Sequence, residues 1–507
     1  MGSTGFILML LTILSKVTGL IREQVSAYYL GIGLLSDVYT SSTNIPFTIY
    51  GFILAGVGTS FIPIYNKIKM EQGEKAADRY TANLANVLFI VSVIVVAFIM
   101  LLAPYIIKLI YPGYSEAKVA LTADFTRILS LATITSVVSS VYIAYLNLKG
   151  SFVIPAMTGM IMNFIHIITF VIAYKLNNFF VIAIGYVLAD ILKYALFPAD
   201  LRRHHYKHKF TLDFKDPNIM LMIKMSVPII LSIAAVDLST IIDQSLASAI
   251  TAGTHGIVAA LKNSILILQL VSGVIVVSIA TVTYPKLSEL ATNHKNGALK
   301  RTMMESITFA QLLVYPATIG LMVLAHPTVK LLFERGNFDA QSTAIISELL
   351  FFYLPSLFGL AIRDLVIRGF YAQRDIRTAV KVTVVQEVIH IGLSLILSKI
   401  MGVSGLALAT SISSILGGFL ILYVFRKKYG RLNLKSFSIK TVKIIIASIL
   451  MGIATHFIYL ALAGKSVLMA FIVSILASIV IYGIIILFMN IQEVKKGVNL
   501  LYKKFAK

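Results

Sequence analysis

Long apolar stretches follow one another along nearly the whole chain, and short polar or basic segments separate them. A helix that crosses the hydrocarbon core of a bilayer needs about 20 mostly apolar residues, so this pattern predicts about fourteen membrane-spanning helices. We expect them near residues 5–30, 36–66, 80–103, 120–147, 152–174, 178–199, 217–250, 255–285, 303–325, 341–371, 377–400, 403–425, 437–463 and 466–491. The expected fold class is therefore an all-α polytopic membrane protein.

The polar breaks between the predicted helices differ in their content of Lys and Arg. Clusters of basic residues recur in alternate breaks, at 67–79, 202–209, 286–301, 374–377 and 426–431, and the chain ends in a basic segment at 495–504. The other breaks carry mostly single cations such as Lys175, Lys399 and Lys465. Cytoplasmic loops are enriched in Lys and Arg, so we expect an even number of spans with both termini in the cytoplasm.

The first twelve predicted helices contain an internal repeat. Pro63 and Pro285 end corresponding spans and lie 222 positions apart (285 − 63), and Lys108 and Lys330 in similar segments have the same spacing (330 − 108). Two copies with an even number of spans enter the membrane in the same direction, which predicts a two-fold axis along the membrane normal and alternating access to a central cavity. We expect a first lobe at 1–216, a second at 217–430, and two additional helices with a basic cytoplasmic tail at 431–507.

The composition of the chain excludes several classes of chemistry. The chain is 58% hydrophobic and 13% charged, and it contains no Cys, which excludes disulfides, thiolate nucleophiles and Cys-bound metals. The net charge of +22 comes from cations between the spans, so it indicates topology and anionic lipid rather than nucleic acid. The sequence has neither a Gly-Lys-Ser/Thr phosphate loop nor a His-Glu-x-x-His motif. We therefore expect a transporter rather than an enzyme, without cofactor or bound metal.

Charged residues within the first two predicted helices are candidate cavity residues. Lys16, Arg22 and Glu23 lie on the first helix, and Asp37 and Asn44 lie on the second. A charge inside a bilayer costs about 2.5 to 3.5 kcal/mol, so such residues usually face a bundle interior or water. One interpretation is internal neutralisation, with Arg22 paired to Glu23 or Asp37. The other is a cationic cavity surface for phosphate, because Arg presents a planar fork of donors.

The second lobe carries further candidates. Lys262 lies on the eighth helix. Arg368 lies one turn from Asp364 on the tenth helix, so Arg368 either forms an ion pair with Asp364 or binds substrate. His390, on the eleventh helix, is either a packed, hydrogen-bonded side chain or a protonatable group.

Several motifs resemble those of the MurJ (MviN) family of lipid II flippases in the MOP exporter superfamily. They include Leu14-Ser-Lys-Val-Thr-Gly-Leu-Ile-Arg-Glu23, Gly31-Ile-Gly-Leu-Leu-Ser-Asp37, Leu332-Phe-Glu-Arg-Gly-Asn-Phe-Asp339 and Gly369-Phe-Tyr-Ala-Gln-Arg-Asp375, in family order between about residues 10 and 430. The resemblance implies two six-helix lobes, two C-terminal helices that form a lipid-tail groove, and flipping of lipid II across the bacterial cytoplasmic membrane, where it contributes to peptidoglycan biosynthesis and cell shape.

The same resemblance assigns residues. It makes Arg22 the cavity arginine, with Glu23 in place of the family's aspartate, Lys16 the preceding basic residue, and Asp37 and Arg368 the matching residues of the second and tenth helices. Two cavity arginines of the family are replaced, one by Tyr50 and one by Leu266. We hypothesise that Lys262, one turn before Leu266, restores the second charge.

Part of the family has a sodium-binding pattern on its seventh, eleventh and twelfth helices. Asp243 and Thr410 match it, and Leu406 offers a carbonyl oxygen. His390 and Ser394 stand where the pattern has Asn and Asp, and His390 would permit protonation instead. The resemblance thus leaves Na⁺ or H⁺ as the coupling ion.

Three classes of function remain after these observations. The first is a flippase for lipid II or, given the missing arginines, for another undecaprenyl-pyrophosphate-linked glycan. The second is a cation-coupled multidrug or metabolite exporter, which usually needs an acidic cavity. The third is a non-transporting scaffold, which leaves the buried charges unexplained. The expected partners are the lipid-linked precursor and membrane lipids, and the expected state is a monomer.

Overall fold

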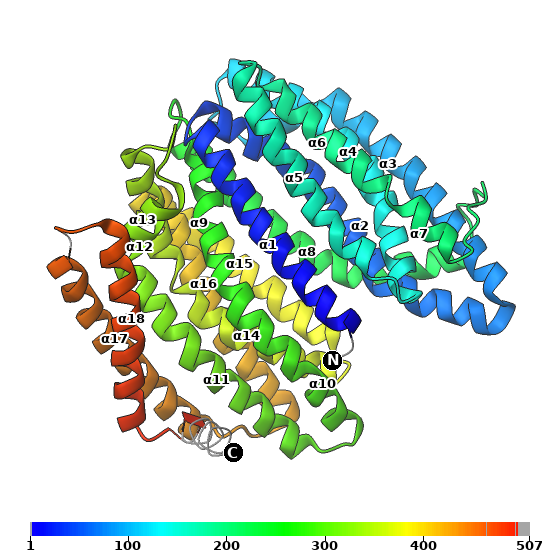
Figure 1. The fold of residues 1–507 in the computed structure, drawn as a ribbon. Helices are drawn as coiled ribbons and strands as arrows, with labels where there is room; N and C mark the ends of the chain where they lie inside the picture. The colour runs from blue at the N-terminus through cyan, green and yellow to red at the C-terminus, as the bar shows by residue number, and fades with distance from the viewer. Residues whose placement is uncertain (1–2, 463, 492, 495–507) are drawn as a thin grey trace. The chain divides into compact units, whose positions relative to one another are not determined.

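The computed structural model describes residues 3–462, 464–491, 493 and 494, and this part of the chain is helical without any β-strand (Figure 1). It divides into two compact units. The first contains Met1–Ala259 and Arg335–Asp339, and the second contains Ala260–Glu334 and Ala340–Lys507. The predicted lobe boundary at 216/217 depends on the sequence repeat and stays a prediction.

The first unit contains the helices α1 to α8. Their bounds are α1 Ser3–Leu30, α2 Leu34–Gln72, α3 Glu74–Ile110, α4 Glu116–Leu148, α5 Val153–Lys175, α6 Phe180–Tyr194, α7 Phe197–Arg203 and α8 Pro217–Ile250. Helix α4 packs between α2, α3 and α6, and α1 packs along α5. Helix α8 packs on α2, where Ser226 contacts Gly56 and donates a hydrogen bond to its carbonyl oxygen over 3.3 Å.

The second unit contains the remaining helices. Their bounds are α9 Ile257–Ser272 (whose first three residues belong to the first unit), the π-helical turn η1 Gly273–Val277, α10 Ser278–Thr292, α11 Asn296–Val323, α12 Ala325–Phe333, α13 Ala340–Tyr353, α14 Ser356–Ala372, α15 Ile376–Met401, α16 Val403–Tyr429, α17 Leu434–Leu462 and α18 Val467–Phe488. Helix α11 packs on both α14 and α17, so the last two helices join the unit along α11.

A helix lies at each of the fourteen predicted positions, in order. Twelve described helices are long and apolar enough to cross a bilayer, and α13 with α14, bent by 47°, gives a thirteenth when the bent pair is counted as one span. Helix α1 occupies the position of the first predicted span, and its 28 residues correspond to about 42 Å, enough to cross a bilayer. The all-α polytopic fold class is confirmed.

The sequence repeat is visible in the helix bounds. Adding 222 to the first residues of α2, α3 and α4 gives positions 256, 296 and 338, and the corresponding helices α9, α11 and α13 begin at 257, 296 and 340. The copies differ where α3 runs unbroken through Pro104 while its counterpart is divided at Leu324 into α11 and α12.

Two predicted helices were too short, because apolar residues mark the part of a helix that lies in the membrane and not the point where the helix ends. Helix α2 ends at Gln72 instead of 66, and α3 begins at Glu74 instead of 80. Polar contacts support these extra turns: Tyr65 donates to Asp78 over 2.8 Å, and Lys69 pairs with Glu74 at 3.3 Å.

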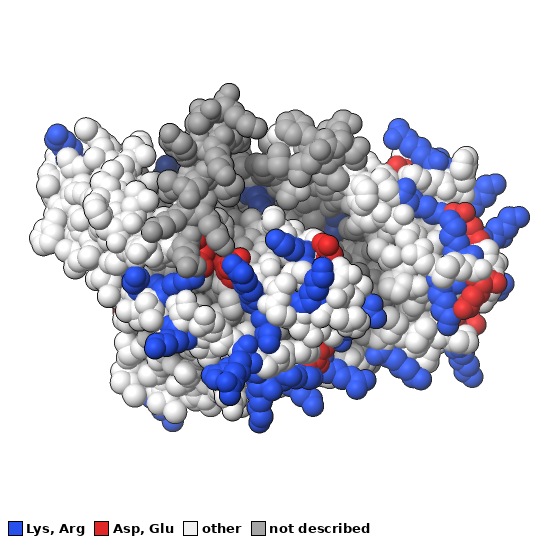
Figure 2. All heavy atoms as spheres, turned by 90° about the horizontal axis from the view of Figure 1, so that it is seen from below, with Lys and Arg blue, Asp and Glu red and all other residues white. Residues whose placement is uncertain are grey.

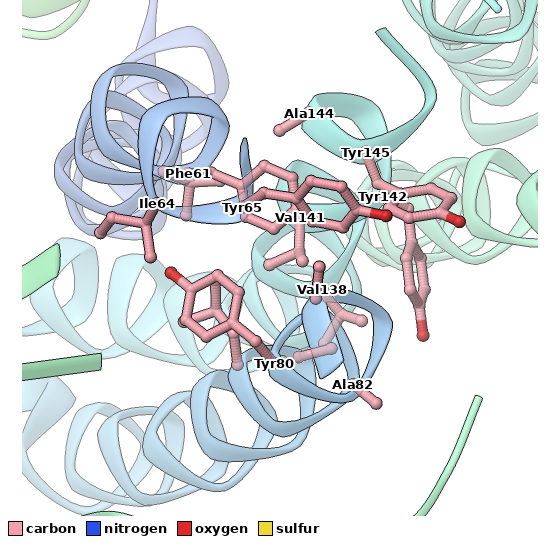
Figure 3. Close-up of a cluster of buried hydrophobic side chains, with 14 of the residues drawn as sticks. Phe61, Ile64, Tyr65, Tyr80, Ala82, Val138, Val141, Tyr142, Ala144 and Tyr145 are labelled. Carbon is pink, nitrogen blue, oxygen red and sulfur yellow. The ribbon is translucent and has the colours of Figure 1, made fainter. Parts of the chain in front are cut away.

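An aromatic core fixes the end of the first unit where α2, α3 and α4 meet (Figure 3). Phe61 stacks on Tyr80 with 6.0 Å between ring centroids, and Tyr65 meets Tyr145 edge to face at 5.8 Å. Buried aromatic side chains contribute large apolar area, and such pairs add about 0.5 to 1.5 kcal/mol each.

The segment between α7 and α8 is held against α3 by two asparagines. Asn83 donates to the carbonyl oxygen of Asp213 and accepts from its amide, and Asn86 donates to the carbonyl oxygens of Lys209 and Thr211. His208 lies in the same segment, and burial lowers the pKa of its imidazole below the ordinary value. The connection between the two sequence repeats is therefore fixed to the first unit.

Candidate functional site

Asp37 is fully buried at the start of α2 and has several partners. Its Oδ2 accepts from Lys118 Nζ on α4 over 2.7 Å and from the amide of Gly256 over 2.7 Å, and its Oδ1 accepts from the amide of Ala259 over 2.9 Å. Gly256 and Ala259 lie at the first turn of α9, so Asp37 caps that helix from another segment. A carboxylate at a helix N-terminus satisfies free N–H groups and interacts favourably with the helix dipole.

The segment Arg335–Asp339 holds the end of α1 in the same unit. The amide of Asn337 donates to the carbonyl oxygen of Tyr28 over 2.9 Å, and its side chain donates to that of Tyr29 over 2.7 Å. The next turn needs Gly31, whose φ is +57° and whose added Cβ would lie 2.3 Å from the carbonyl oxygen of Asn337. The Gly31 and Asn337 motifs, distant in sequence, therefore meet at this end of the unit.

Arg22 lies on α1, and its guanidinium donates to Oε1 of Glu23. The Arg22 side chain is 28% exposed, whereas that of Glu23 is 7% exposed. Helix α1 is placed by α5: Asn163 donates to the carbonyl oxygen of Ser15 over 3.1 Å and to the hydroxyl of Thr18 over 3.2 Å. The predicted pairing of Arg22 with Glu23 is present, and the guanidinium is still partly accessible.

Lys16 is exposed on α1, one and a half turns before Arg22. No residue in the described ranges forms an ion pair with it. The assignment of Lys16 to the cavity stays a prediction.

Asn44 belongs to a hydrogen-bonded group that joins α2, the end of α3 and α8. Its Nδ2 donates to Oε1 of Gln244 over 2.5 Å and to the hydroxyl of Tyr111 over 3.0 Å, and Tyr111 donates to the same Gln244 oxygen over 2.9 Å. These contacts give Asn44 a packing role in the first unit.

Tyr50, at a position where the resemblance implies a family arginine, lies beside a buried cation. Lys193 Nζ is 5.8 Å from the centre of the Tyr50 ring, forms an ion pair with Asp190, and donates to Ser136 over 3.0 Å. Both charged side chains are nearly inaccessible. The positive charge near Tyr50 is thus neutralised inside the protein.

In the second unit, Lys262 is half-buried on α9, and Arg368 lies on α14. Asp364 pairs with its neighbour Arg363 at 3.4 Å rather than with Arg368. The Arg368 guanidinium instead lies 5.8 Å from the centre of the Tyr284 ring, and no ion pair to it occurs in the described part of this unit. The ion-pair interpretation of Arg368 is therefore not supported by its contacts.

The candidate cation residues are divided between the units. Asp243 is buried on α8 in the first unit. In the second, His390 Nε2 lies 3.1 Å from the Thr410 hydroxyl and 3.3 Å from that of Ser394, and Thr410 donates to the Leu406 carbonyl oxygen over 3.2 Å. Glu387 approaches the other ring nitrogen of His390 at 3.7 Å. No cluster of three or more His, Asp or Glu suited to a metal occurs among the residues described.

Two buried ion pairs were missed from the sequence. Lys118 lies just before the predicted start of its span, where the apolar pattern carries no sign that it pairs with Asp37. Asp190 and Lys193 gave a usable signal, because opposite charges three residues apart within an apolar span suggest a buried pair.

An apolar groove of about 370 Å³ runs between α11, α17 and α18 in the second unit. At one end the Tyr482 hydroxyl donates to the Leu312 carbonyl oxygen over 3.0 Å. The walls include Leu313, Pro316, Leu321, Met451, Phe471 and Ile475. The groove provides a surface suited to a hydrocarbon chain.

A family model described as "Lipid II flippase MurJ" matches residues 26–490. The chain belongs to the MurJ family. Among its relatives, a probable lipid II flippase MurJ of Rickettsia prowazekii (strain Madrid E) is 25% identical over 500 residues and covers 96% of each chain. The corresponding Rhizobium meliloti (strain 1021) protein is 26% identical over 432 residues, 83% of this chain and 80% of that protein.

Solved structures show the same fold as this MurJ family member. A lipid II flippase MurJ in an inward closed conformation matches with a TM-score of 0.82 at 22% identity, over 99% of this chain and 100% of that one. An inward-facing MATE transporter of the MOP superfamily matches with a TM-score of 0.69 at 16% identity, over 82% and 98% of the two chains. MurJ membership makes the chain a multi-pass membrane transporter rather than an enzyme.

Proposed function

We propose that this chain moves lipid II from the inner to the outer leaflet of the bacterial cytoplasmic membrane by alternating access, and that Arg22 receives the diphosphate of the substrate. The observation that supports this role is the partly accessible Arg22 guanidinium on helix α1, next to the buried carboxylate of Glu23. A guanidinium has five N–H donors, so pairing with Glu23 leaves donors for phosphate oxygens.

Lys16 adds a second cation on the same helix. It lies six residues before Arg22, which corresponds to about 9 Å along the helix axis. A mobile ammonium at this distance suits a diphosphate with an attached sugar, because it contributes charge without demanding a fixed geometry. Arg368 and Lys262 are the cations we assign to the substrate in the second unit.

Asp37 serves the transport cycle rather than the substrate in this proposal. Its oxygens are occupied by Lys118 and by the first turn of α9, and it has almost no exposed surface. A buried carboxylate that loses its partners is strongly destabilising. We therefore expect the contacts of Asp37 to form together and to break together. We assign Asp37 to a latch that holds the start of α9 in one of the alternating states.

The groove along α11, α17 and α18 is assigned to the polyprenyl tail of the substrate. Its lining is apolar, and its position on the last two helices agrees with the expectation from the family resemblance.

Both termini are assigned to the cytoplasm because the basic breaks alternate in register. The protein is proposed to act as a monomer.

Proton coupling through His390 is favoured over sodium coupling. His390 shares its Nε2 with the hydroxyls of Thr410 and Ser394, and its other nitrogen faces Glu387. An imidazole can carry a proton near neutral pH, whereas Ser394 stands in place of the aspartate of the family's sodium pattern and removes one negative charge that Na⁺ would need. Transport in proteoliposomes under separate pH and Na⁺ gradients tests this, and dependence on Na⁺ alone would reject it.

The function is tested by complementation of a strain depleted of its own lipid II flippase. Wild-type protein is expected to restore growth, and Arg22→Ala is expected to fail at equal membrane expression. Growth supported by Arg22→Ala would remove the diphosphate role from Arg22, and failure of the wild type would count against lipid II as the substrate.

A second candidate substrate is another undecaprenyl-pyrophosphate-linked glycan. Tyr50 stands in place of a family arginine, and the nearby Lys193 is already paired with Asp190, so one headgroup contact of the family is missing. Binding of lipid II and of other polyprenyl-linked glycans to the purified protein distinguishes the two substrates. Tighter binding of another glycan would favour this second candidate.

A further inference from the structure

A polar chamber of about 540 Å³ in the second unit is lined by the first turns of α11, by the start of α17 with the segment before it, and by Glu493. Four cations line it: Lys300, Arg301, Arg431 and Lys440. Two carboxylates, Glu305 and Glu493, also line it. The volume lies within the range of about 300 to 1,000 Å³ that is typical of small-molecule sites, and the lining has an excess of positive charge.

The cations of the chamber are held to different degrees. Lys440 pairs with Glu493 at 2.6 Å, and Arg301 pairs with Glu305 at 3.3 Å. Lys300 donates to the Tyr429 carbonyl oxygen over 3.2 Å, which neutralises no charge. Arg431 is exposed and has no ion pair with any residue in the described ranges. Lys300 and Arg431 are therefore the two cations without a carboxylate partner that an anion would meet.

Glu493 adds a hydrogen-bond acceptor. Its Oε1 accepts from Lys440, while its Oε2 is buried and accepts no hydrogen bond from any residue that the structure describes. A buried oxygen of this kind is costly unless a donor reaches it. A ligand hydroxyl beside the phosphate-binding cations would satisfy this oxygen.

The chamber and the apolar groove are lined by neighbouring turns of the same helix, α11. Thr308 lines the chamber and Leu312 lines the groove, and four residues of α11 correspond to about 6 Å. Leu313, 44% exposed, lies at this end of the groove. Polar and apolar compartments thus adjoin over one helical turn, as the headgroup and acyl chains of a lipid do.

Lys and Arg side chains are abundant on the described surface shown in Figure 2, and Asp and Glu are few there.

We propose that this chamber binds the headgroup of an anionic glycerophospholipid whose headgroup carries hydroxyls, with an acyl chain beside Leu312 and Leu313. The phosphate interacts with Lys300 and Arg431, and a headgroup hydroxyl donates to Glu493 Oε2. Phosphatidylglycerol has this chemistry. The site is separate from Arg22, and a phospholipid headgroup suits the chamber volume better than the much larger sugar-peptide headgroup of lipid II.

The absence of Trp from the sequence permits a direct binding test. In full-length Leu313→Trp protein, the single indole reports lipids with brominated acyl chains by fluorescence quenching in phosphatidylcholine vesicles. Brominated phosphatidylglycerol is expected to quench about 25-fold more effectively per mole than brominated phosphatidylcholine, because each of the two cations favours anionic lipid by about fivefold. Brominated phosphatidylethanolamine is expected to behave like phosphatidylcholine, and equal quenching by all three lipids overturns the proposal.

Variants in the same background locate the site. Arg431→Gln is expected to reduce the preference for phosphatidylglycerol about fivefold, and addition of Lys300→Gln is expected to abolish it. The matched control is Lys435→Gln, which removes an exposed cation of α17 outside the chamber lining and is expected to leave the preference unchanged. Equal loss in the control, or no loss in Arg431→Gln, overturns the proposal.

Lipid II binding to Arg431→Gln without the Leu313→Trp change separates this site from the transport site, because Leu313 lines the groove assigned to the polyprenyl tail. Arg431→Gln is expected to bind lipid II as the wild type does, because Arg22 is unchanged. A fall in lipid II affinity with unchanged phosphatidylglycerol preference would assign the chamber to the substrate and overturn the proposal. Since no transport is measured, failure of the lipid II function leaves this result unaffected.

Discussion

Two ion pairs near the start of the first unit differ in how completely their charges are satisfied. In the pair of Asp37 with Lys118, the side chains are 2% and 3% exposed, and the carboxylate also accepts two backbone N–H groups. In the pair of Arg22 with Glu23, the arginine is 28% exposed. One pair holds three segments together, and the other presents a cation that a ligand can reach.

The comparison shows that a charge within a membrane helix does not by itself identify a substrate contact. Arg22, Glu23 and Asp37 lie within sixteen positions of sequence, and each pair joins a carboxylate to a basic side chain. Accessibility and the number of remaining donors distinguish them, since only a partly exposed group with free donors can exchange its partner for a phosphate. Changes to each pair should therefore affect different measurements.

The largest effect is expected for Asp37→Ala. The substitution leaves Lys118 as an unpaired buried cation and removes the cap from α9, so we expect a loss of about 3 to 5 kcal/mol in stability. The measurement is unfolding of the purified protein in detergent. The double variant Asp37→Asn/Lys118→Met removes both charges and is expected to recover most of this loss. If Asp37→Ala were as stable as the wild type, the assignment of Asp37 to a latch on α9 would be contradicted.

Arg22→Ala should affect binding rather than folding. Loss of charge-assisted hydrogen bonds worth about 1.5 to 3 kcal/mol predicts lipid II affinity about 10- to 100-fold lower, with unfolding close to wild type because Arg22 is partly exposed. Arg22→Lys keeps the positive charge but lacks the planar fork of donors. Its lipid II affinity is expected to lie between those of the wild type and Arg22→Ala. Equal affinities of wild type and Arg22→Ala would place the diphosphate elsewhere.

The sequence was sufficient for the fold because apolar length and the 222-residue repeat are local or periodic signals. Helices α9, α11 and α13 begin within two residues of the positions that the repeat gives. The partners of Asp37 were not predictable in this way: Lys118 lies 81 positions away and Gly256 lies 219 positions away. Which charges meet depends on helix packing, so the sequence identified Asp37 as a buried charge but did not separate its role from that of Arg22.

Lys16→Gln should produce a smaller loss than Arg22→Ala. The ammonium is exposed and mobile, so its removal is expected to lower lipid II affinity about fivefold, as for one cation near an anionic lipid headgroup. Binding measured at low and high salt checks this, because screening should reduce the difference between wild type and variant. A loss as large as that of Arg22→Ala would mean that Lys16 binds the diphosphate directly.

The smallest effect is expected for Glu23→Gln, and its sign is informative. If Glu23 and the diphosphate compete for the same guanidinium, removal of the negative charge should tighten lipid II binding by about two- to fivefold, the range for a partly exposed ion pair. The amide still accepts a hydrogen bond from Arg22, so the orientation of the side chain is retained. Asp37→Asn is the matched control, because the same change in the buried pair should reduce stability without tightening binding. Weaker lipid II binding by Glu23→Gln would instead show that the carboxylate is needed to orient Arg22, and the two pairs would then differ in accessibility but not in their dependence on the negative partner.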